Sequence, residues 1–190
     1  MFIAGSARAA SHNKRLARLG AAIANANDIP ATFADLGDYP MPLYDGDLET
    51  AEGPPDNARK LKALMELHVG VLICCPEYNS SITPLLKNTL DWVSRVRDEG
   101  EATNHVFKTR VFALASASPG GMGGLRGLVA VRTVLEIGLG ALVLPEQFAL
   151  PRAADAYDDG ETLKDKQAQS RFEEQIQKLA RASRVLHCAE

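Results

Sequence analysis

Apolar runs and segments with helical spacing alternate along the whole chain of 190 residues. Short apolar runs bounded by turn residues are typical of strands, and a continuous one such as VGVLICC is typical of a central parallel strand covered on both faces. Segments whose apolar residues recur every three or four positions predict helices between these runs. Five strands are therefore predicted, at Met1–Ala4, Ala31–Leu36, Val69–Cys75, Arg110–Ala117 and Ala141–Leu144.

A helix is predicted after each of the five strands. Ser11 is a candidate cap for the first helix, the second begins at Asp56, and Pro84 suits the first turn of the third. The fourth helix follows the glycine-rich loop Pro119–Gly124, and the fifth closes the chain around Phe172–Leu186. The alternation of strands and helices is the pattern of βαβ units on a parallel sheet, with helices on both faces.

Two stretches predict long loops instead of regular structure. Pro40–Pro55 is rich in proline and glycine, and Asp98–Lys108 is a polar connector. The chain shows no internal repeat and no shift in composition that would mark a boundary. We therefore expect one α/β domain over residues 1–190, built as a three-layer sandwich.

Composition narrows the class of protein. Hydrophobic residues make up 46% of the chain and charged residues 24%, and the net charge is −3, so no basic surface for nucleic acid or anionic membranes is expected. No stretch approaches the length of a membrane-spanning helix, and no signal peptide is evident. Cys74, Cys75 and Cys188 form no disulfide framework, and the first two lie in an apolar strand, so we expect core cysteines in a cytoplasmic protein.

Ligands of such sheets bind outside the carboxyl ends of the strands, where the strand order reverses. This rule selects three loops, at Gly5–Asn13, Pro76–Ser81 and Ser116–Gly124. All three have unusual compositions, so we expect the binding site to lie between them.

The first loop, GSARAASHN, has the composition of an anion site. A helix amino terminus offers unpaired N–H groups and partial positive charge, to which Ser6 and Ser11 add hydroxyls, Asn13 an amide and Arg8 a forked cation. The fingerprints GxxxxGK[ST] and GxGxxG are absent, which argues against an ATP site or a Rossmann dinucleotide site. The alternative is a helix that Ser11 simply caps, with an exposed arginine nearby.

The second and third loops suit a flat ligand. Pro76 and Tyr78 can form an apolar ledge for a ring, and Asn79 can hydrogen-bond heteroatoms along the ring edge. The third loop has four glycines between Pro119 and Leu125, which let the backbone approach a flat ligand closely. A proline-rich turn and a flexible connector are the structural alternatives for these two loops.

Together the segments GSARAASHN, PEYNSSITPLLKNTLDW and ASPGGMGGLRG resemble the NADPH-dependent FMN reductase family of flavodoxin-like proteins. The segment PLYDGDLE at Pro42–Glu49 fits as well, and the resemblance spans residues 5 to about 151. It implies a flavodoxin-like α/β/α sandwich with a five-stranded parallel sheet in the order 2-1-3-4-5. The first strand, Met1–Ala4, is several residues shorter than the resemblance implies.

The resemblance also implies three groups of contacts to FMN. The phosphate would be held by Ser6, Arg8, Ser11 and Asn13. The ribityl chain and the isoalloxazine ring would be lined by Pro76, Glu77, Tyr78 and Asn79. The other side of the ring would be closed by Ser116, Ala117 and Ser118.

Members that resemble this chain are homodimers or homotetramers. The resemblance therefore implies that the helix Leu85–Arg95, which carries Asp91 and Trp92, lies at a subunit interface. Tyr44, Asp45 and Asp47 would lie on a loop that reaches the partner's pocket or would form an ordinary surface turn. Arg126 and Arg132 would meet a nucleotide phosphate or lie on a solvated helix face.

The expected activity is an FMN-dependent NAD(P)H oxidoreductase with a ping-pong cycle. Hydride would pass from NADPH or NADH to the flavin, and then to a quinone, free flavin, azo compound or metal oxyanion. Because the flavin carries this chemistry, no general acid or base is required for the hydride step, and the scattered histidines predict no metal site. The alternatives are a non-enzymatic electron carrier and a redox-sensing binding protein that uses Cys75.

Overall fold

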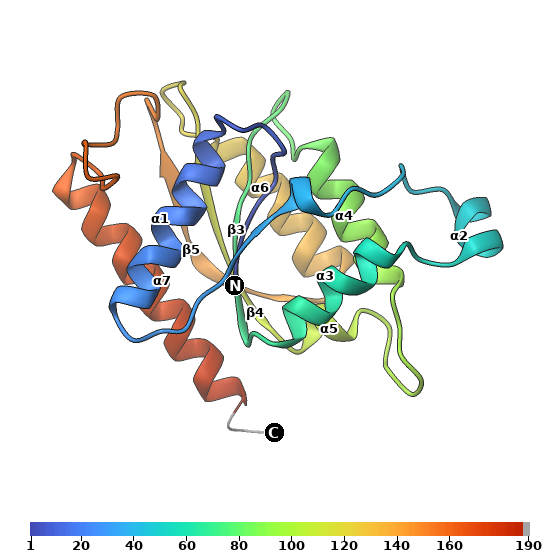
Figure 1. The fold of residues 1–190 in the computed structure, drawn as a ribbon. Helices are drawn as coiled ribbons and strands as arrows, with labels where there is room; N and C mark the ends of the chain where they lie inside the picture. Colours follow the sequence, from blue (N-terminus) through green and yellow to red (C-terminus); the bar gives the residue numbers. More distant parts are fainter. Residues whose placement is uncertain (188–190) are drawn as a thin grey trace.

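A computed structural model describes residues 1–187 of the chain, so Cys188 lies outside the described residues. Its sheet has five parallel strands in the order β2-β1-β3-β4-β5, which confirms the predicted fold (Figure 1). The strands are β1 (Phe2–Ala4), β2 (Phe33–Asp35), β3 (Gly70–Cys74), β4 (Val111–Ala117) and β5 (Leu142–Leu150).

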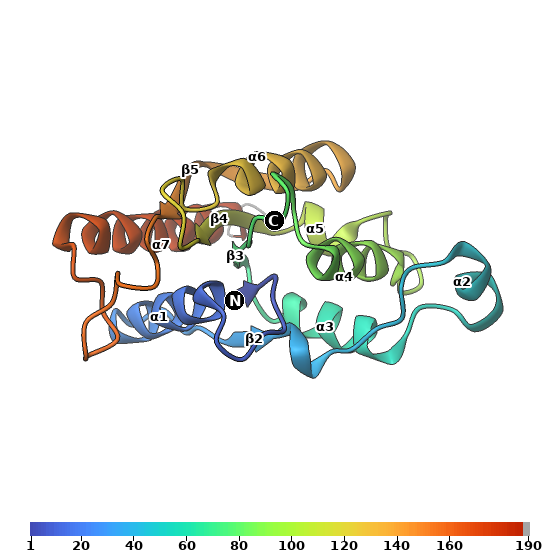
Figure 2. The ribbon, with the colours of Figure 1, turned by 90° about the horizontal axis from the view of Figure 1, so that it is seen from above.

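Helices cover both faces of the sheet and make the three layers visible in Figures 1 and 2. One face carries α1 (His12–Ala26) and α7 (Lys166–His187). The other carries α3 (Asp56–Glu66), α4 (Pro84–Arg95), α5 (His105–Lys108) and α6 (Leu125–Thr133), the last continued by a π-helical turn over Val134–Gly138. The five predicted helices are thus confirmed, whereas α5 was predicted as part of a polar connector.

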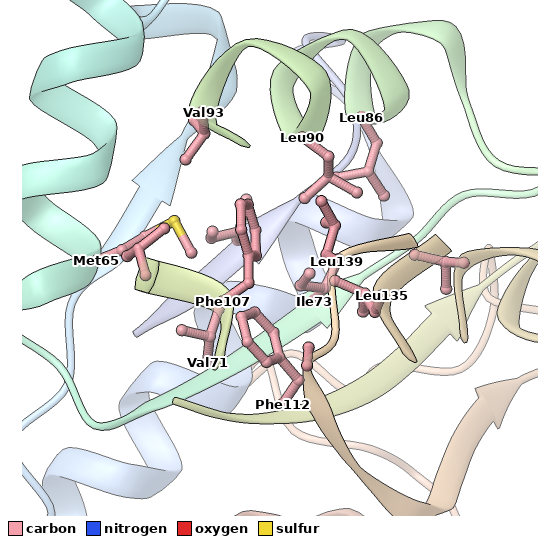
Figure 3. Close-up of a cluster of buried hydrophobic side chains, with 14 of the residues drawn as sticks. Met65, Val71, Ile73, Leu86, Leu90, Val93, Phe107, Phe112, Leu135 and Leu139 are labelled. Atoms are coloured by element: carbon pink, nitrogen blue, oxygen red, sulfur yellow. The ribbon is translucent and has the colours of Figure 1, made fainter. Parts of the chain in front are cut away.

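The core is divided between the two faces of the sheet. Figure 3 shows part of the cluster under α3, α4, α5 and α6, where the rings of Phe107 and Phe112 lie 6.0 Å apart between centroids. Cys74 and Cys75 are fully buried on opposite faces, as predicted for core residues. Burial raises the pKa of the Cys75 thiol to about 12, so this thiol is not a reactive one.

Strand β5 runs to Leu150, whereas the sequence predicted that it ends at Leu144. Pro145 suggested an end, but the strand continues through an irregularity in its pairing with β4. The carbonyl groups that this irregularity frees find donors in neighbouring helices. Arg132 donates to the Leu144 carbonyl at 2.7 Å, and Gln175 donates to the Glu146 carbonyl at 3.0 Å.

The segment after β2 projects from the body of the molecule and carries a helix that was not predicted, α2 (Gly46–Glu52) (Figures 1 and 2). The base of this segment covers α4. Trp92 is fully buried, donates to the Pro42 carbonyl at 2.7 Å and packs edge-on against Tyr44 at 5.0 Å. The Trp92 side chain is therefore covered by its own chain, and the expectation that the helix Leu85–Arg95 lies at a subunit interface stays a prediction.

None of the helices within residues 1–187 combines the length and the apolar character needed to cross a membrane.

Candidate cofactor site

Three loops meet at the carboxyl edge of the sheet, at the top of Figure 1. They follow β1, β3 and β4, which are neighbours in the sheet. Backbone hydrogen bonds hold the starts of these loops together. The Gly5 N–H donates to the Cys74 carbonyl at 2.9 Å, and the Cys75 N–H donates to the Ala115 carbonyl at 2.8 Å. The structure therefore brings the three predicted segments to one place.

Local hydrogen bonds shape the first loop. The Ser6 hydroxyl accepts from the Arg8 N–H, and the Ser11 hydroxyl caps α1 by accepting from the Lys14 N–H, both at 3.3 Å. The buried Lys14 ammonium donates to the Ala7 carbonyl at 3.1 Å and pairs with Asp35 at 2.7 Å. Lys14 thus fixes the loop to the end of β2. Sequence reasoning missed it, although its position three residues after the cap was a signal.

Backbone donors of this loop fit a phosphate group. Arg8 is exposed, and its guanidinium has no acidic partner within residues 1–187. Several N–H groups at the loop and at the start of α1 also have no acceptor in the described part of the chain. These belong to Ala7, Ala9, Ala10, His12 and Asn13. Unpaired donors at a helix amino terminus beside a free arginine have the chemistry that a phosphomonoester requires.

Asn13 connects the first loop to the third. It is 3% exposed, and its amide exchanges two hydrogen bonds with the backbone of Ala117. One side-chain N–H and the carbonyl oxygen of the amide are thereby occupied. The Asn13 side chain holds the end of β4 beside α1, and its backbone N–H remains available to a ligand.

A tight hairpin turn forms the tip of the second loop. Tyr78 and Ser81 exchange two backbone hydrogen bonds at 3.0 Å, and the φ angles of Asn79 and Ser80 between them are +50° and +64°. This geometry is a type I′ turn, which usually contains glycine. Two non-glycine residues with positive φ store strain of a kind that clusters at ligand sites. The turn leaves Tyr78 47% exposed at the carboxyl edge.

Glu77 joins the second loop to α6. Its carboxylate accepts from the backbone N–H groups of Arg126 and Gly127 at 3.0 and 3.2 Å and pairs with the Arg126 guanidinium. It therefore caps a helix that has no cap of its own at Gly124. Partial burial would raise the pKa of Glu77, but the Arg126 charge and these hydrogen bonds outweigh that effect and hold it below the usual range.

The glycine loop folds back on the end of β4. The buried Ser116 hydroxyl donates to the Gly123 carbonyl at 2.6 Å, and the Ser118 N–H donates to the Leu150 carbonyl at 3.1 Å. Gly124 has a φ of +88°, and a Cβ there would lie 3.0 Å from the Ser116 side chain. Glycine is required at this position by both its conformation and its surroundings.

The predicted site residues therefore divide into two kinds. Arg8, Tyr78 and Asn79 are exposed at the edge, together with backbone groups of the first loop. Other predicted residues are engaged in connecting the loops and hold them in place. These are Asn13, Glu77 and Ser116.

The two helix arginines are already engaged within the chain. Arg126 pairs with Glu77, and Arg132 pairs with Glu136 at 2.7 Å in addition to its bond to β5. Neither side chain is free to meet a nucleotide phosphate without losing these contacts.

Comparison with known proteins gives a consistent result. The model of the family described as NADPH-dependent FMN reductase matches residues 1–155. A quinone reductase from Pseudomonas putida is 31% identical over 165 residues, which cover 86% of this chain and 83% of that protein. A quinone reductase from Escherichia coli is 34% identical over 140 residues, covering 74% of this chain and 70% of that protein.

A solved structure agrees as well. The flavoenzyme NAD(P)H:(acceptor) oxidoreductase FerB from Paracoccus denitrificans has a TM-score of 0.71 and 25% identity, with 94% of this chain and 96% of that one covered.

Proposed function

The chain belongs to the NADPH-dependent FMN reductase family, and from this premise we propose that it passes reducing equivalents from NAD(P)H to a small oxidant in a ping-pong cycle. Its class as an NAD(P)H-dependent, FMN-containing oxidoreductase follows from the family. The proposal concerns the mechanism, the acceptor and the residues that hold the cofactor.

The observation that carries the proposal is the set of unpaired donors at the first loop. Arg8 and the backbone N–H groups between Ala7 and Asn13 would hold the FMN phosphate, with the Ser6 and Ser11 hydroxyls beside them. These donors lie at the carboxyl end of β1, next to the strand-order reversal at which such sheets bind their ligands.

The second and third loops would line the ring. Pro76, Tyr78 and Asn79 would lie along one side, and Ser116, Ala117 and Ser118 along the other. When bound, FMN supplies a ring that takes up hydride from the nicotinamide and gives it up again to the oxidant. The residues of this chain would position the flavin ring and leave one side of it open to a second planar molecule.

No side chain at this edge is proposed as a catalytic acid or base. Glu77 is the acidic residue within the second loop, and its lowered pKa and its role as a helix cap keep it ionised at neutral pH. Catalysis would come from holding two planar reactants in contact, which removes most of the entropic cost of their encounter.

An open site accepts many oxidants in turn after the nicotinamide product leaves. We propose a quinone, free flavin, azo compound or metal oxyanion as the acceptor, and a homodimer or homotetramer in the cytoplasm as the working form. A thiol-based sensor is disfavoured by the complete burial of Cys75. An electron carrier would bind FMN but react slowly with NAD(P)H.

The test is the visible absorption of the FMN-loaded protein without oxygen, before and after NADPH is added. Rapid bleaching of the flavin bands, followed by recovery when a quinone is added, is the expected result. Retained colour with both NADPH and NADH would contradict the reductase mechanism and favour the carrier. Failure to retain FMN would contradict the site assignment.

A further inference from the structure

The segment that follows β5 packs directly against the glycine loop at the carboxyl edge of the sheet (Figures 1 and 2). The Ser118 N–H donates to the Leu150 carbonyl at 3.1 Å, and the Arg152 N–H donates to the Gly120 carbonyl at 3.2 Å. The approach is close, since a Cβ at Gly123 would lie 2.8 Å from the carbonyl carbon of Leu150. Arg152 is therefore fixed to the loop that is proposed to line the flavin ring.

The backbone of Arg152 has a conformation that large side chains avoid. Its φ angle is +50°, in the left-handed region, which glycine adopts without strain and arginine does not. The Asp155 N–H closes the turn by donating to the Arg152 carbonyl at 3.1 Å, and the Asp155 carboxylate forms no ion pair with the Arg152 guanidinium. Strained residues of this kind cluster at ligand sites, so the Arg152 side chain needs an account beyond the fold.

The charge of Arg152 is free to meet an anion. Its guanidinium is exposed and has no hydrogen-bond or ion-pair partner within residues 1–187. The N–H groups of Gly121 and Met122, at the tip of the neighbouring loop, also have no acceptor in the described part of the chain. Of the other arginines near the three loops, Arg8 is proposed to hold the FMN phosphate and Arg126 is paired with a carboxylate. Arg152 is thus the arginine beside the third loop that remains for a second anionic ligand.

We propose that Arg152 binds a phosphate group of the nicotinamide nucleotide. The inference rests on the proposed function, in which the third loop lines the ring and the FMN phosphate lies at the first loop. The nicotinamide must lie against the ring to deliver hydride, so the rest of the nucleotide has to leave the ring over one of the surrounding loops. Over the third loop, its pyrophosphate or the 2′-phosphate of NADPH meets a forked guanidinium, which binds phosphate oxygens in pairs.

Calorimetric titration of the FMN-loaded protein with NADP⁺ and with NAD⁺ tests the proposal. The variant Arg152→Asn removes the charge, and asparagine tolerates the left-handed conformation, so the fold should be kept. We expect about tenfold weaker binding, as for the loss of one charge-assisted hydrogen bond. A loss for NADP⁺ alone would identify the 2′-phosphate, and an equal loss for both nucleotides would identify the pyrophosphate. In turnover, KM for the affected nucleotide should rise about tenfold while kcat, FMN affinity and the thermal midpoint stay unchanged.

Two further variants and a control separate the charge from the backbone. Arg152→Gly relieves the strain and should lose the same affinity as Arg152→Asn, whereas Arg152→Lys keeps a cation and should recover part of it. The matched control is Arg181→Asn, at an exposed position of α7 that lies beside Asn27, just past the end of α1. Neither nucleotide should respond to this control.

The opposite results would overturn the inference. Unchanged affinities for both nucleotides in Arg152→Asn and Arg152→Gly would refute it and leave the proposed function intact. A fall in FMN affinity in these variants would place Arg152 at the FMN phosphate, and an equal loss in Arg181→Asn would mean that only the net charge matters. If the natural chain retains no FMN, or if neither NADPH nor NADH reduces it, the proposed function fails and this inference falls with it.

Discussion

Asn13 and Ala117 are 104 positions apart in sequence and exchange two hydrogen bonds between the first and the third loop of the proposed cofactor site. The Asn13 amide N–H donates to the Ala117 carbonyl at 2.8 Å, and the Ala117 N–H donates to the Asn13 amide oxygen at 3.0 Å. The pair fixes the start of α1 against the end of β4. The first loop, proposed to hold the phosphate, and the third loop, proposed to line the ring, are thereby held at one spacing.

Replacing Asn13 by alanine should destabilise the protein by about 1–3 kcal/mol, because it leaves a buried N–H and a buried carbonyl without partners. The affinity for FMN should fall as well, since the two loops lose their common spacing. Urea unfolding and FMN titration measure the two effects. Asn57→Ala, which removes a single exposed bond to the Pro40 carbonyl, is the control and should cost well under 1 kcal/mol. Equal stabilities of the two variants would contradict the assigned role of Asn13.

Replacing Arg8 by alanine should weaken FMN binding by about 1.5–3 kcal/mol, the usual value of a hydrogen bond to a charged group. Riboflavin lacks the phosphate, so its affinity should not change. Arg59→Ala, at an exposed position of α3, is the matched control, and neither ligand should respond to it. Loss of riboflavin binding in Arg8→Ala would show that Arg8 supports the ring or the fold instead of the phosphate.

Glu77→Gln should lower the free energy of unfolding by about 1 kcal/mol at neutral pH, because the cap of α6 loses its charge and its ion pair with Arg126. The pKa of Glu77 in the folded protein lies below its ordinary value of 4.5. Its contribution is therefore complete above about pH 4.5 and is lost as the pH falls through the lowered pKa. Unfolding curves of both proteins between pH 3 and 7 should converge only at the acid end. A difference independent of pH would refute the ionic cap.

The sheet and its main helices could be predicted because local patterns determine them. The run VGVLICC is apolar throughout, as a strand covered on both faces requires, and Thr83 followed by Pro84 marks the start of α4. The end of β5 could not be predicted in this way. Pro145 is typical of a strand end, yet the strand resumes its pairing with β4 at Gln147, and Arg132 and Gln175 donate to the Leu144 and Glu146 carbonyls from helices distant in sequence.

The meeting of the three loops could also be predicted, since loops after adjacent parallel strands end at the same edge of the sheet. What each side chain does there depends on partners that are remote in sequence. Glu77 resembles a ligand-lining residue in sequence, yet it caps a helix that begins 48 residues later, at Leu125. The burial of Trp92 likewise depends on the segment containing Pro42, which lies 50 positions earlier in the sequence. Such roles can be recognised only in the folded structure.

Two glycines of the third loop differ in whether their position requires glycine. Gly124 has a φ of +88°, and a Cβ there would lie 3.0 Å from Ser116, whereas Gly121 has no atom within 4 Å of such a Cβ. Gly124→Ala should therefore cost about 2 kcal/mol of stability, since a left-handed conformation is unfavourable for alanine and the Ser116 contact adds to this. Gly121→Ala should leave stability unchanged or raise it by about 0.5 kcal/mol, through a smaller loss of chain entropy on folding.

The same pair of variants tests how the loop contributes to binding. If Gly124 holds the loop in the shape that binds FMN, Gly124→Ala should reduce the free energy of FMN binding by more than it reduces the free energy of unfolding. The reason is that Ser116 and the backbone after it must move to admit the new methyl group. Thermal unfolding with and without FMN measures both quantities on one sample, since a bound ligand stabilises the folded state by an amount that grows with the logarithm of its affinity. A loop that acts only as a flexible connector would respond to the two substitutions alike, because both add the same methyl group within four residues of each other.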